Sequence, residues 1–307
     1  MRRVNSKLKT QNSKLRMVHG FLNIDKPAGM TSHDVVARMR RAARQKRVGH
    51  AGTLDPAATG VLVVALGAAT RLIEYVQEAT AKRYRAVVRL GATTTTDDAE
   101  GEVLLTAPVP DLDAVEIERA LNQFRGAIEQ VPPMYAALHH EGRRLHELAR
   151  AGVVVERAAR MVTIDRLALL EWSPPLLVLD VMCSKGTYIR ALGRDLGEAL
   201  GCGAHLHELR RTAVGPFLVE HATPLAFIEK YPQNIMSTLC EPEVAVADWP
   251  AVSLSDEQAR RVRNGQTIAL DGIAGARARA HTPDGALLAL LGRAGDDWKP
   301  EKVFDWT

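Results

Sequence analysis

Residues 47–60 read Arg47-Val-Gly-His50-Ala-Gly-Thr-Leu-Asp55-Pro-Ala-Ala-Thr-Gly60, and the apolar run Val61-Leu-Val-Val-Ala-Leu66 follows directly. Because proline follows Asp55, the aspartate is biased away from helix and toward an extended backbone. The glycines in this stretch permit turns and close approaches that other residues resist. The segment therefore predicts a loop that presents one carboxylate just before an apolar strand. A lone aspartate in a turn more often caps or forms that turn, so a chemical role for Asp55 needs support from the rest of the chain.

The composition indicates a two-domain protein with a substantial core. At 307 residues, the chain exceeds the size at which a single hydrophobic core usually stops growing. Apolar residues make up 46% of it, yet no apolar run reaches the roughly 20 residues needed to cross a bilayer. Cys183, Cys202 and Cys240 are widely spaced and form no CxxC pair, so neither a disulfide framework nor a zinc ribbon is indicated. We therefore expect a cytoplasmic protein with reduced thiols and no membrane partner.

The net charge of +4 says little about nucleic-acid binding, because the positive excess lies at the start of the chain. Residues 1–17 carry six Lys or Arg and no acid, so the remaining residues sum to −2. This start lacks the apolar core of a signal peptide. Two interpretations remain open: a disordered basic arm, or upstream sequence that precedes a start at Met17.

A strand and a basic helix are expected before the Asp55 loop. Gly20–Ile24 has the pattern of a short strand, and Thr31 followed by Asp34 resembles a capping box that starts a helix reaching Ala43. Basic side chains with no acid among them gather in and after the second half of this helix: Arg38, Arg40, Arg41, Arg44, Lys46 and Arg47. Such a cluster is either a solvated face or a surface that contacts the phosphates of a nucleic acid.

The remaining pattern predicts an α+β fold. Residues 83–90 alternate with a period of two between a largely apolar and a largely basic face, which indicates a half-buried strand. Residues 113–124 and 145–151 look helical, and residues 176–182 form another apolar strand. Strands and helices that mix without regular βαβ alternation favour the α+β class.

The last part of the chain predicts a second domain. After residue 235, short apolar strands are separated by turn signals such as Asp271-Gly272 and Pro283-Asp-Gly285, which indicates a small β-rich unit. We therefore expect one domain over residues 18–235 and another over residues 236–307. On this pattern alone, a purely structural role for the second domain stays open.

Five motifs together suggest a family. They are Asp25-Lys-Pro-Ala-Gly29-Met-Thr-Ser, the Asp55 loop, Lys82-Arg-Tyr84-Arg, Cys183-Ser-Lys-Gly-Thr-Tyr-Ile-Arg190 and Gly203-Ala-His-Leu-His-Glu-Leu209-Arg-Arg211. In this order and spacing, they resemble the TruB family of tRNA pseudouridine synthases from near Gly20 to roughly Phe217. The resemblance implies the pseudouridine synthase fold, with a mixed, largely antiparallel central sheet and flanking helices. It also implies that the C-terminal β-rich unit is a PUA-like RNA-binding domain.

The reaction implied by this resemblance needs a carboxylate. Pseudouridine forms when the bond between C1′ of the ribose and N1 of uracil breaks, the base turns, and C1′ joins C5. There is no redox change, and we expect no cofactor. Asp55 suits attack at C1′ or addition at C6, and the sequence does not choose between them. A pocket carboxylate also needs a fixed cation to stay ionised, because desolvation alone raises its pKa.

Arg190 is the candidate cation. Gly186-Thr187 is expected to open a helix, which puts Arg190 in the first turn, where a cation opposes the helix dipole. Pairing with an acid from another segment would explain this placement, and a guanidinium suits a planar carboxylate. The resemblance implies that Asp55 is this acid. The alternative is an exposed arginine that extends away from the helix end.

The resemblance also assigns roles around the target uridine to five side chains: Tyr84, His50, Leu209, Lys26 and Lys82. It places Tyr84 against the flipped base as a catalytic residue, with its hydroxyl as a candidate base for the C5 proton. His50 would fill the space that the flipped base leaves, and Leu209 would form a pocket wall. Lys26 would order the rim of the site, and Lys26 and Lys82 are both assigned to substrate binding. Each of these residues also has an ordinary reading as a core or surface side chain.

Residues 134–146 depart from the family pattern. Ala136 and His139 stand where serine and lysine are frequent, and His146 replaces a frequent tyrosine. These changes leave the details of substrate contact in this region open. His139-His140 and His205-x-His207 have no acid or cysteine partners at ligand spacing, so we expect no metal.

We therefore expect an enzyme that converts one uridine in the T-loop of tRNA, tRNA position 55, to pseudouridine. A tRNA-folding chaperone whose binding outweighs its chemistry is one alternative. A guide-dependent rRNA pseudouridine synthase of the Cbf5 kind is another, although this compact chain lacks the longer extensions of that class. The expected partner is the T-arm of tRNA, without a guide RNA, and the expected state is a monomer.

Overall fold

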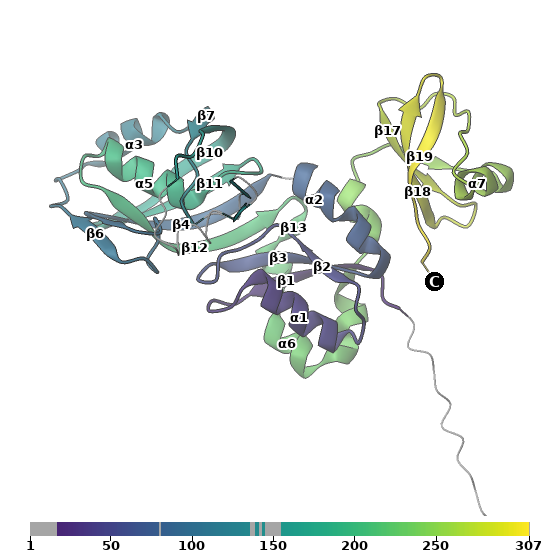
Figure 1. The fold of residues 1–307 in the computed structure, drawn as a ribbon, viewed down its shortest axis with the longest axis horizontal. Helices are drawn as coiled ribbons and strands as arrows, with labels where there is room; N and C mark the ends of the chain where they lie inside the picture. The colour runs from purple at the N-terminus through teal and green to yellow at the C-terminus, as the bar shows by residue number, and fades with distance from the viewer. Residues whose placement is uncertain (1–16, 80, 136–138, 141–142, 145–154, 307) are drawn as a thin grey trace, which may run out of the picture.

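The computed structural model describes residues 17–79, 81–135, 139–140, 143–144 and 155–306 (Figure 1). The basic stretch 1–16, the expected helix at 145–151 and the substitutions at Ala136 and His146 lie outside these residues. No helix in the described part of the chain is long and apolar enough to cross a membrane.

One mixed, largely antiparallel sheet forms the centre of the molecule, as predicted. It has 11 strands, and its main order is β14-β1-β3-β12-β4-β11-β10-β7, with β13, β15 and β2 paired alongside. Only the β1–β14 and β3–β12 pairs are parallel. The strands are β1 (Gly20–Lys26), β2 (Val48–Ala51), β3 (Thr59–Leu66), β4 (Lys82–Leu90), β7 (Gly126–Gln130), β10 (Arg160–Ser173), β11 (Leu176–Cys183), β12 (Ala204–Val214), β13 (Phe217–Leu218), β14 (Thr223–Pro224) and β15 (Leu239–Cys240).

Helices and two small hairpins accompany this sheet (Figure 1). Its α-helices are α1 (Ser32–Ala42), α2 (Ile73–Ala79), α3 (Ala114–Asn122), α5 (Ile189–Ala199) and α6 (Leu225–Lys230), whereas α7 (Asp256–Arg263) packs on the C-terminal sheet. The 3-10 helices are η1 (Gly67–Leu72), η2 (Val219–His221), η3 (Pro232–Thr238) and η4 (Pro242–Val246). The hairpins pair β5 (Ala92–Thr94) with β6 (Val103–Thr106) and β8 (His139–His140) with β9 (Arg143–Arg144).

The apolar run after the Asp55 loop becomes β3, which is buried on both faces. Leu62, Val64 and Leu66 belong to a core shared with α1, α3 and α5. Val61 and Val63 point to the other face, into a core that includes residues of the C-terminal domain. A strand covered on both sides needs no polar alternation, which explains the continuous apolar sequence.

The start of α1 has the predicted capping box. Thr31 is the N-cap, its hydroxyl accepts from the Asp34 amide at 3.1 Å, and the Asp34 carboxylate accepts from the Thr31 amide at 2.9 Å. The helix buries Val35, Val36 and Met39. These local interactions fix where α1 begins, directly after the Lys26 motif.

Strand β4 alternates largely as predicted. Its apolar face is buried, and Arg83, Arg85 and Arg89 are exposed. Val87 lies on the same side as these arginines but is buried, and Val178 of β11 lies opposite it.

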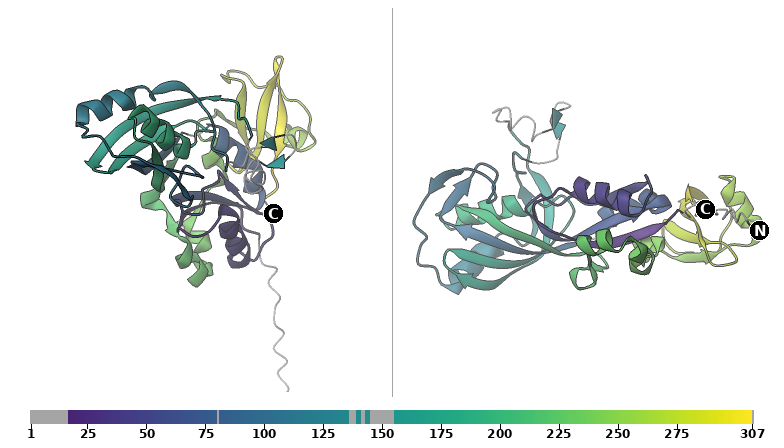
Figure 2. Two further views of the ribbon diagram at one scale, coloured as in Figure 1. Left: turned by 60° about the vertical axis from the view of Figure 1, so that its left-hand side comes forward. Right: turned by 90° about the horizontal axis from the view of Figure 1, so that it is seen from below.

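The C-terminal β-rich domain is also present, at the end of the molecule away from α3 (Figure 2). Its sheet has the order β16 (Ala251–Ser253), β17 (Arg277–His281), β18 (Leu287–Ala294), β19 (Asp297–Val303), with one parallel pair, β16–β17. Its own core contains Val262 of α7 and the fully buried Trp298. Leu290 and Phe304 instead pack with Phe21 and Tyr75 of the central domain, so the two domains share a hydrophobic contact.

Candidate active site

The Asp55 loop joins two antiparallel strands, β2 and β3, and is anchored to α1. The Ser32 hydroxyl accepts from the Leu54 amide at 2.9 Å and donates to the Leu54 carbonyl at 3.1 Å. Within the loop, the Ala58 amide donates to the Asp55 carbonyl at 3.1 Å. Leu54 is buried, and both its amide and its carbonyl are hydrogen-bonded to Ser32. The next residue, Asp55, lies at the surface of the loop, with 40% of its side chain exposed.

Lys26 is hydrogen-bonded to the backbone of this loop. Its residue is fully buried, and Nζ donates to the carbonyls of Pro27 at 2.9 Å and Pro56 at 3.0 Å. Burial lowers the pKa of Lys26, while the negative charge of Asp55 opposes that shift. A side chain with no exposed surface does not reach RNA, so we propose that Lys26 positions the loop instead of contacting the substrate.

The expected pairing of Arg190 with Asp55 is present. Arg190 Nε lies 3.1 Å from Asp55 Oδ2, and Nη2 lies 3.4 Å from Oδ1, so the guanidinium faces both carboxylate oxygens. Arg190 is the second residue of α5, and only 7% of its side chain is exposed. Its remaining donors reach the carbonyls of Tyr135 at 2.9 Å and Thr96 at 3.3 Å. These partners hold the cation in place against the unfavourable helix dipole.

A second carboxylate, Asp98, was missed by the sequence analysis. Its Oδ2 lies 3.6 Å from Arg190 Nη1, and 15% of its side chain is exposed. Its Oδ1 accepts from the Thr96 hydroxyl at 2.5 Å and the Glu100 amide at 3.1 Å, which fixes the carboxylate. The next residue back, Asp97, pairs with Arg194 at 2.9 Å. The only sequence signal is two adjacent acids after four threonines, and that run lies outside the five motifs.

The electrostatic setting of Asp55 combines opposing effects. Burial raises the pKa of its carboxyl above the usual aspartate range, and the guanidinium of Arg190 is the largest influence that lowers it. The charge of Asp98 raises the Asp55 pKa further, whereas Lys26 and Arg211 lower it. Asp55 therefore combines substantial desolvation with a fixed cation, which is typical of a functional carboxylate.

Asp55 and Arg190 open into a cavity of about 340 Å³. Its lining comes from the segment between β1 and α1, the second half of the Asp55 loop, β4, the 98–99 loop, α5 and the middle of β12: Ala28, Asp55, Ala57, Ala58, Thr59, Arg85, Asp98, Ala99, Arg190, Leu206, His207, Glu208, Leu209 and Arg210. Leu209 thus lies on the wall where it was expected. A cavity of this size is within the usual range for small-molecule sites.

Three other expected residues lie near the loop but are not part of the described cavity lining. Tyr84 is buried, and burial raises the pKa of its hydroxyl while the nearby Arg211 opposes that shift. His50 packs edge-to-face on His33 with ring centroids 5.3 Å apart, and burial lowers the pKa of His50. Burial also lowers the pKa of Lys82.

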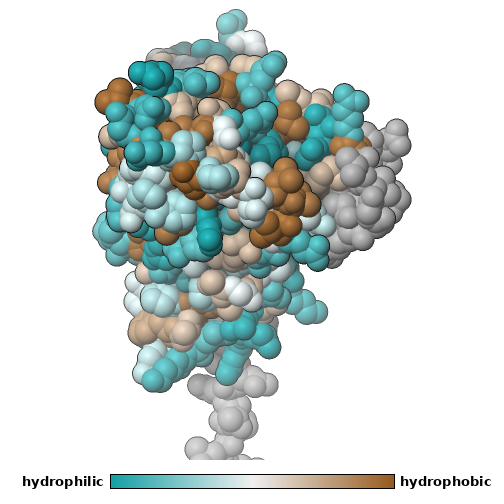
Figure 3. Space-filling model, turned by 90° about the vertical axis from the view of Figure 1, so that its left-hand side faces the viewer, coloured by the Kyte–Doolittle hydropathy of each residue, from teal (hydrophilic) through white to brown (hydrophobic). Residues whose placement is uncertain are grey.

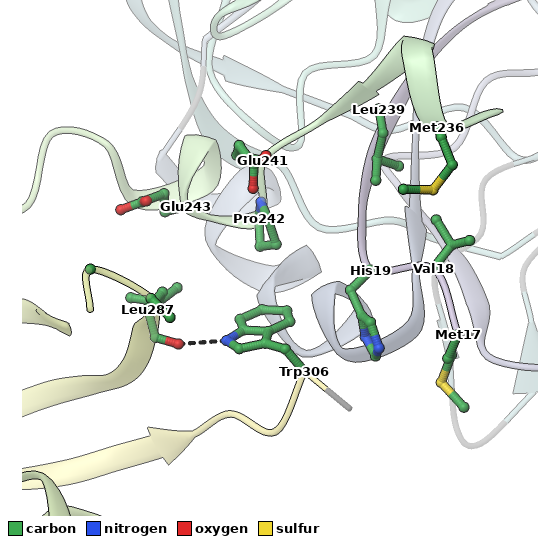
Figure 4. Close-up of a pocket in the computed structure, with 12 residues that line it drawn as sticks. Met17, Val18, His19, Met236, Leu239, Glu241, Pro242, Glu243, Leu287 and Trp306 are labelled. Carbon is green, nitrogen blue, oxygen red and sulfur yellow. Dashed lines mark hydrogen bonds between the residues drawn. The ribbon is translucent and has the colours of Figure 1, made fainter. Parts of the chain in front are cut away.

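A second cavity, of about 440 Å³, lies between the domains (Figure 4). Trp306 and His19 face each other across it with ring centroids 5.7 Å apart, and the Trp306 indole donates to the Leu287 carbonyl. None of the described residues that line it belongs to the five motifs. The cavity at Asp55 is therefore the candidate active site.

Comparison with known proteins decides the family. The family model "TruB family pseudouridylate synthase (N terminal domain)" matches residues 40–189. Two further models, "tRNA pseudouridylate synthase B C-terminal domain" and "tRNA Pseudouridine synthase II, C terminal", match residues 190–236 and 249–305. A tRNA pseudouridine synthase B from Gloeobacter violaceus is 51% identical over 255 residues, which cover 82% of this chain and 87% of that protein. The chain belongs to the TruB family.

Other similar proteins agree with this assignment. A tRNA pseudouridine synthase B from Syntrophomonas wolfei is 44% identical over 279 residues, covering 89% of this chain and 93% of the relative. Among solved structures, the chain resembles one in a crystal structure of a Cbf5-Nop10-Gar1 complex with a TM-score of 0.73 and 29% identity, covering 95% of this chain and 86% of that one. The expected pseudouridine synthase fold is thereby confirmed.

Proposed function

We propose that this TruB-family protein isomerises one uridine in the T-loop of tRNA, tRNA position 55, to pseudouridine. Its curated relatives carry the name tRNA pseudouridine synthase B, which supports tRNA as the substrate and an isomerase as the enzyme class. The proposal rests on one observation: the Asp55–Arg190 ion pair lines a cavity that is large enough to hold one small ring.

The geometry assigns each residue a part in the reaction. Arg190 faces both oxygens of Asp55 and so fixes the plane of the carboxylate, while the 40% exposed fraction leaves the carboxylate accessible from the cavity. An oriented, ionised carboxylate is competent either to attack C1′ or to add at C6 of the base. Either route forms a covalent link to Asp55, breaks the C1′–N1 bond and ends with C1′ joined to C5 and the carboxylate released. The C5–H bond breaks, its hydrogen leaves as a proton, and N1 gains a proton, so atoms and electrons balance.

The uracil must leave its stack to reach this carboxylate, because a base within a structured loop does not expose these atoms. We propose that Leu209 on the cavity wall retains the detached base, and that the ring of Tyr84 lies against it once the substrate enters. An ordinary tyrosine hydroxyl is already protonated near neutral pH, and burial raises the pKa of Tyr84 further, which favours the ring contact over a role for Tyr84 as a phenolate base. For His50 and Lys82, we retain the proposed contacts with the RNA around the flipped nucleotide.

The two alternatives are less well supported. The relatives at 43–51% identity are named as tRNA enzymes, whereas the Cbf5 structures are more distant at 28–29% identity. A chaperone that only binds tRNA would have no need for the Asp55–Arg190 geometry. We therefore propose catalysis without a guide RNA and without a cofactor.

Release of tritium from [5-³H]uridine in unmodified tRNA tests the proposal, with purified protein as the only other component. We expect release from wild-type protein and none from Asp55→Asn. Asp271→Asn, which changes an exposed aspartate in the C-terminal domain, is the matched control and should behave as wild type. Binding of tRNA without release would favour the chaperone, and release only after addition of a guide RNA would favour the Cbf5-like reading.

We also propose a cytoplasmic monomer with domains at 18–235 and 236–307. The separate core of the C-terminal sheet supports this division. At the end of the central domain that carries β6 and α3, apolar side chains form islands among polar ones instead of one continuous face (Figure 3). Scattered apolar residues do not require a partner subunit. Light scattering of the purified protein at micromolar concentration should give the mass of one chain, and a dimer mass would contradict this.

A further inference from the structure

Arg211, the last residue of the fifth motif, is one of the most deeply buried polar side chains in the described structure, with 1% of the residue exposed. A guanidinium keeps its charge in a protein and has five N–H donors to satisfy. None of the ion pairs among the described residues includes Arg211. Burying a charge is costly unless it is paired or hydrogen-bonded, so the neutral partners of Arg211 must account for its position.

Those partners are backbone carbonyls at both ends of the Asp55 loop. Arg211 Nε donates to the Val61 carbonyl at 2.7 Å, immediately after the loop. Its Nη2 donates to Gly52 at 3.0 Å and its Nη1 to Thr53 at 3.3 Å, immediately before Asp55. One rigid guanidinium thus connects the two strands that enter and leave the loop.

The same side chain reaches Tyr84. Arg211 lies opposite Tyr84 in the β12–β4 register, and its guanidinium is close enough to the Tyr84 hydroxyl to lower the pKa of that group against the larger effect of burial. A guanidinium held by three backbone carbonyls therefore gives the Tyr84 ring a fixed neighbour. Arg211 is therefore in contact with both the catalytic loop and the proposed stacking residue, although the two are 29 positions apart in the sequence.

We propose that Arg211 is a positioning residue, whose guanidinium holds the Asp55 loop and Tyr84 in one fixed arrangement around the target nucleotide. This inference rests on the proposed function. Arg211 would not touch the RNA, because it is buried beneath the loop. Its effect would appear in the rate of the chemical steps, because small displacements of a catalytic group slow a reaction far more than they weaken binding.

Arg83 offers a matched control on the neighbouring strand β4. Its side chain is 51% exposed and pairs with Asp180 through two hydrogen bonds of 2.7 and 2.8 Å. It is not among the described residues that line the Asp55 cavity. Arg83→Lys therefore changes the same residue type in the same sheet without disturbing the contacts of Arg211.

The experiment compares wild type, Arg211→Lys, Arg211→Gln and Arg83→Lys by single-turnover tritium release, tRNA binding and thermal denaturation. For Arg211→Lys we expect a rate about 100-fold lower, tRNA affinity within about 3-fold of wild type, and a folded protein. Arg83→Lys changes an exposed ion pair, so its saturated rate and tRNA affinity should both stay within about 3-fold of wild type. A second readout is a double-mutant cycle with Tyr84→Phe. Because Arg211 and Tyr84 are neighbours across β12 and β4, their effects on the rate should not add.

Three outcomes would overturn the inference. The first is a folded Arg211→Lys protein whose saturated rate equals that of Arg83→Lys. The second is strict additivity of Arg211→Lys and Tyr84→Phe. The third is failure of both Arg211 variants to fold, since the residue would then stabilise the whole domain instead of the site. An inactive wild-type protein would instead refute the proposed function, so the two failures are distinguishable.

Discussion

Replacement of Arg190 by lysine is the sharpest test of the catalytic pair. Arg190 contributes two contacts to Asp55, at 3.1 and 3.4 Å, and two more to the carbonyls of Tyr135 and Thr96. A lysine ammonium is a compact charge that cannot reproduce this planar fork. Arg190→Lys therefore leaves a positive charge near Asp55 but removes the geometry that orients the carboxylate.

The expected magnitude follows from the burial of the pair. Breaking a fully buried ion pair costs about 3–5 kcal/mol, but 40% of the Asp55 side chain is exposed, so solvent screening favours a value of about 3 kcal/mol or less. If that loss falls on the transition state, it corresponds to a rate about 150-fold lower. Single-turnover tritium release at saturating enzyme measures this rate directly.

Arg194 on the same helix provides the control for this prediction. It lies one turn further along α5 and pairs with Asp97 and Asp195 at 2.9 and 2.8 Å. Arg194→Lys changes a paired arginine of the same helix without touching Asp55, and its rate should stay within about 3-fold of wild type. A folded Arg190→Lys protein with near-wild-type turnover would refute the role of the pair, as would equal losses in the two variants.

Three further predictions address the pH dependence, the loop backbone and the basic cluster. Catalysis needs ionised Asp55, and both burial and the charge of Asp98 raise the pKa of Asp55. As the pH is lowered, activity should therefore be lost at a higher pH than an ordinary aspartate would cause. Asp98→Asn should move this loss of activity to lower pH, and a shift to higher pH in the rate–pH profile would contradict the coupling. Gly60→Ala should lower the melting temperature more than Gly126→Ala: both glycines have positive φ, +98° and +79°, but only at Gly60 does a Cβ meet another atom, the Arg211 carbonyl oxygen at 2.2 Å. Equal losses in thermal denaturation would mean that backbone strain alone accounts for the effect. Replacing the exposed Arg41 and Arg44 together by alanine should reduce the slope of log K for tRNA against log salt by about 1.4–1.8 if both contact phosphates, and an unchanged slope in filter binding would identify the cluster as a solvated face.

Local sequence patterns predicted most of the elements that carry the site. The period of two over residues 83–90 identified β4, and the Thr31–Asp34 pattern identified the start of α1, because both depend on residues within a few positions of one another. The first turn of α5 was placed correctly, and the suspicion that its arginine has an acidic partner came from the helix dipole. The partner itself, 135 positions away, was supplied only by the family resemblance.

Residues whose role depends on packing between distant segments were harder to predict. Asp98 lies in a hairpin loop and reaches Arg190 only because the 94–101 segment folds over β12. Lys26 resembles a surface lysine beside a proline, yet the strand that precedes it buries it beneath the loop. Arg211 was visible as part of a motif, but nothing in its sequence neighbourhood distinguishes it from the exposed Arg210. Only the three-dimensional contacts separate these two arginines.

The charges around Asp55 suggest how the site keeps its carboxylate ionised during the reaction. Arg190 contacts Asp55 directly, while Lys26 and Arg211 lower its pKa from beneath the loop, against the opposing effect of Asp98. When a nucleotide fills the cavity, the exposed 40% of the Asp55 side chain loses its water, and desolvation would raise its pKa further. The same loss of water strengthens the attraction of the fixed cations, because charges interact more strongly at a lower dielectric constant. Cations buried beneath the loop still attract the Asp55 carboxylate after the substrate fills the cavity. A surface lysine would instead also bind the phosphates of the RNA. We therefore infer that Lys26 and Arg211 act on Asp55 through their charge and without contact with the substrate.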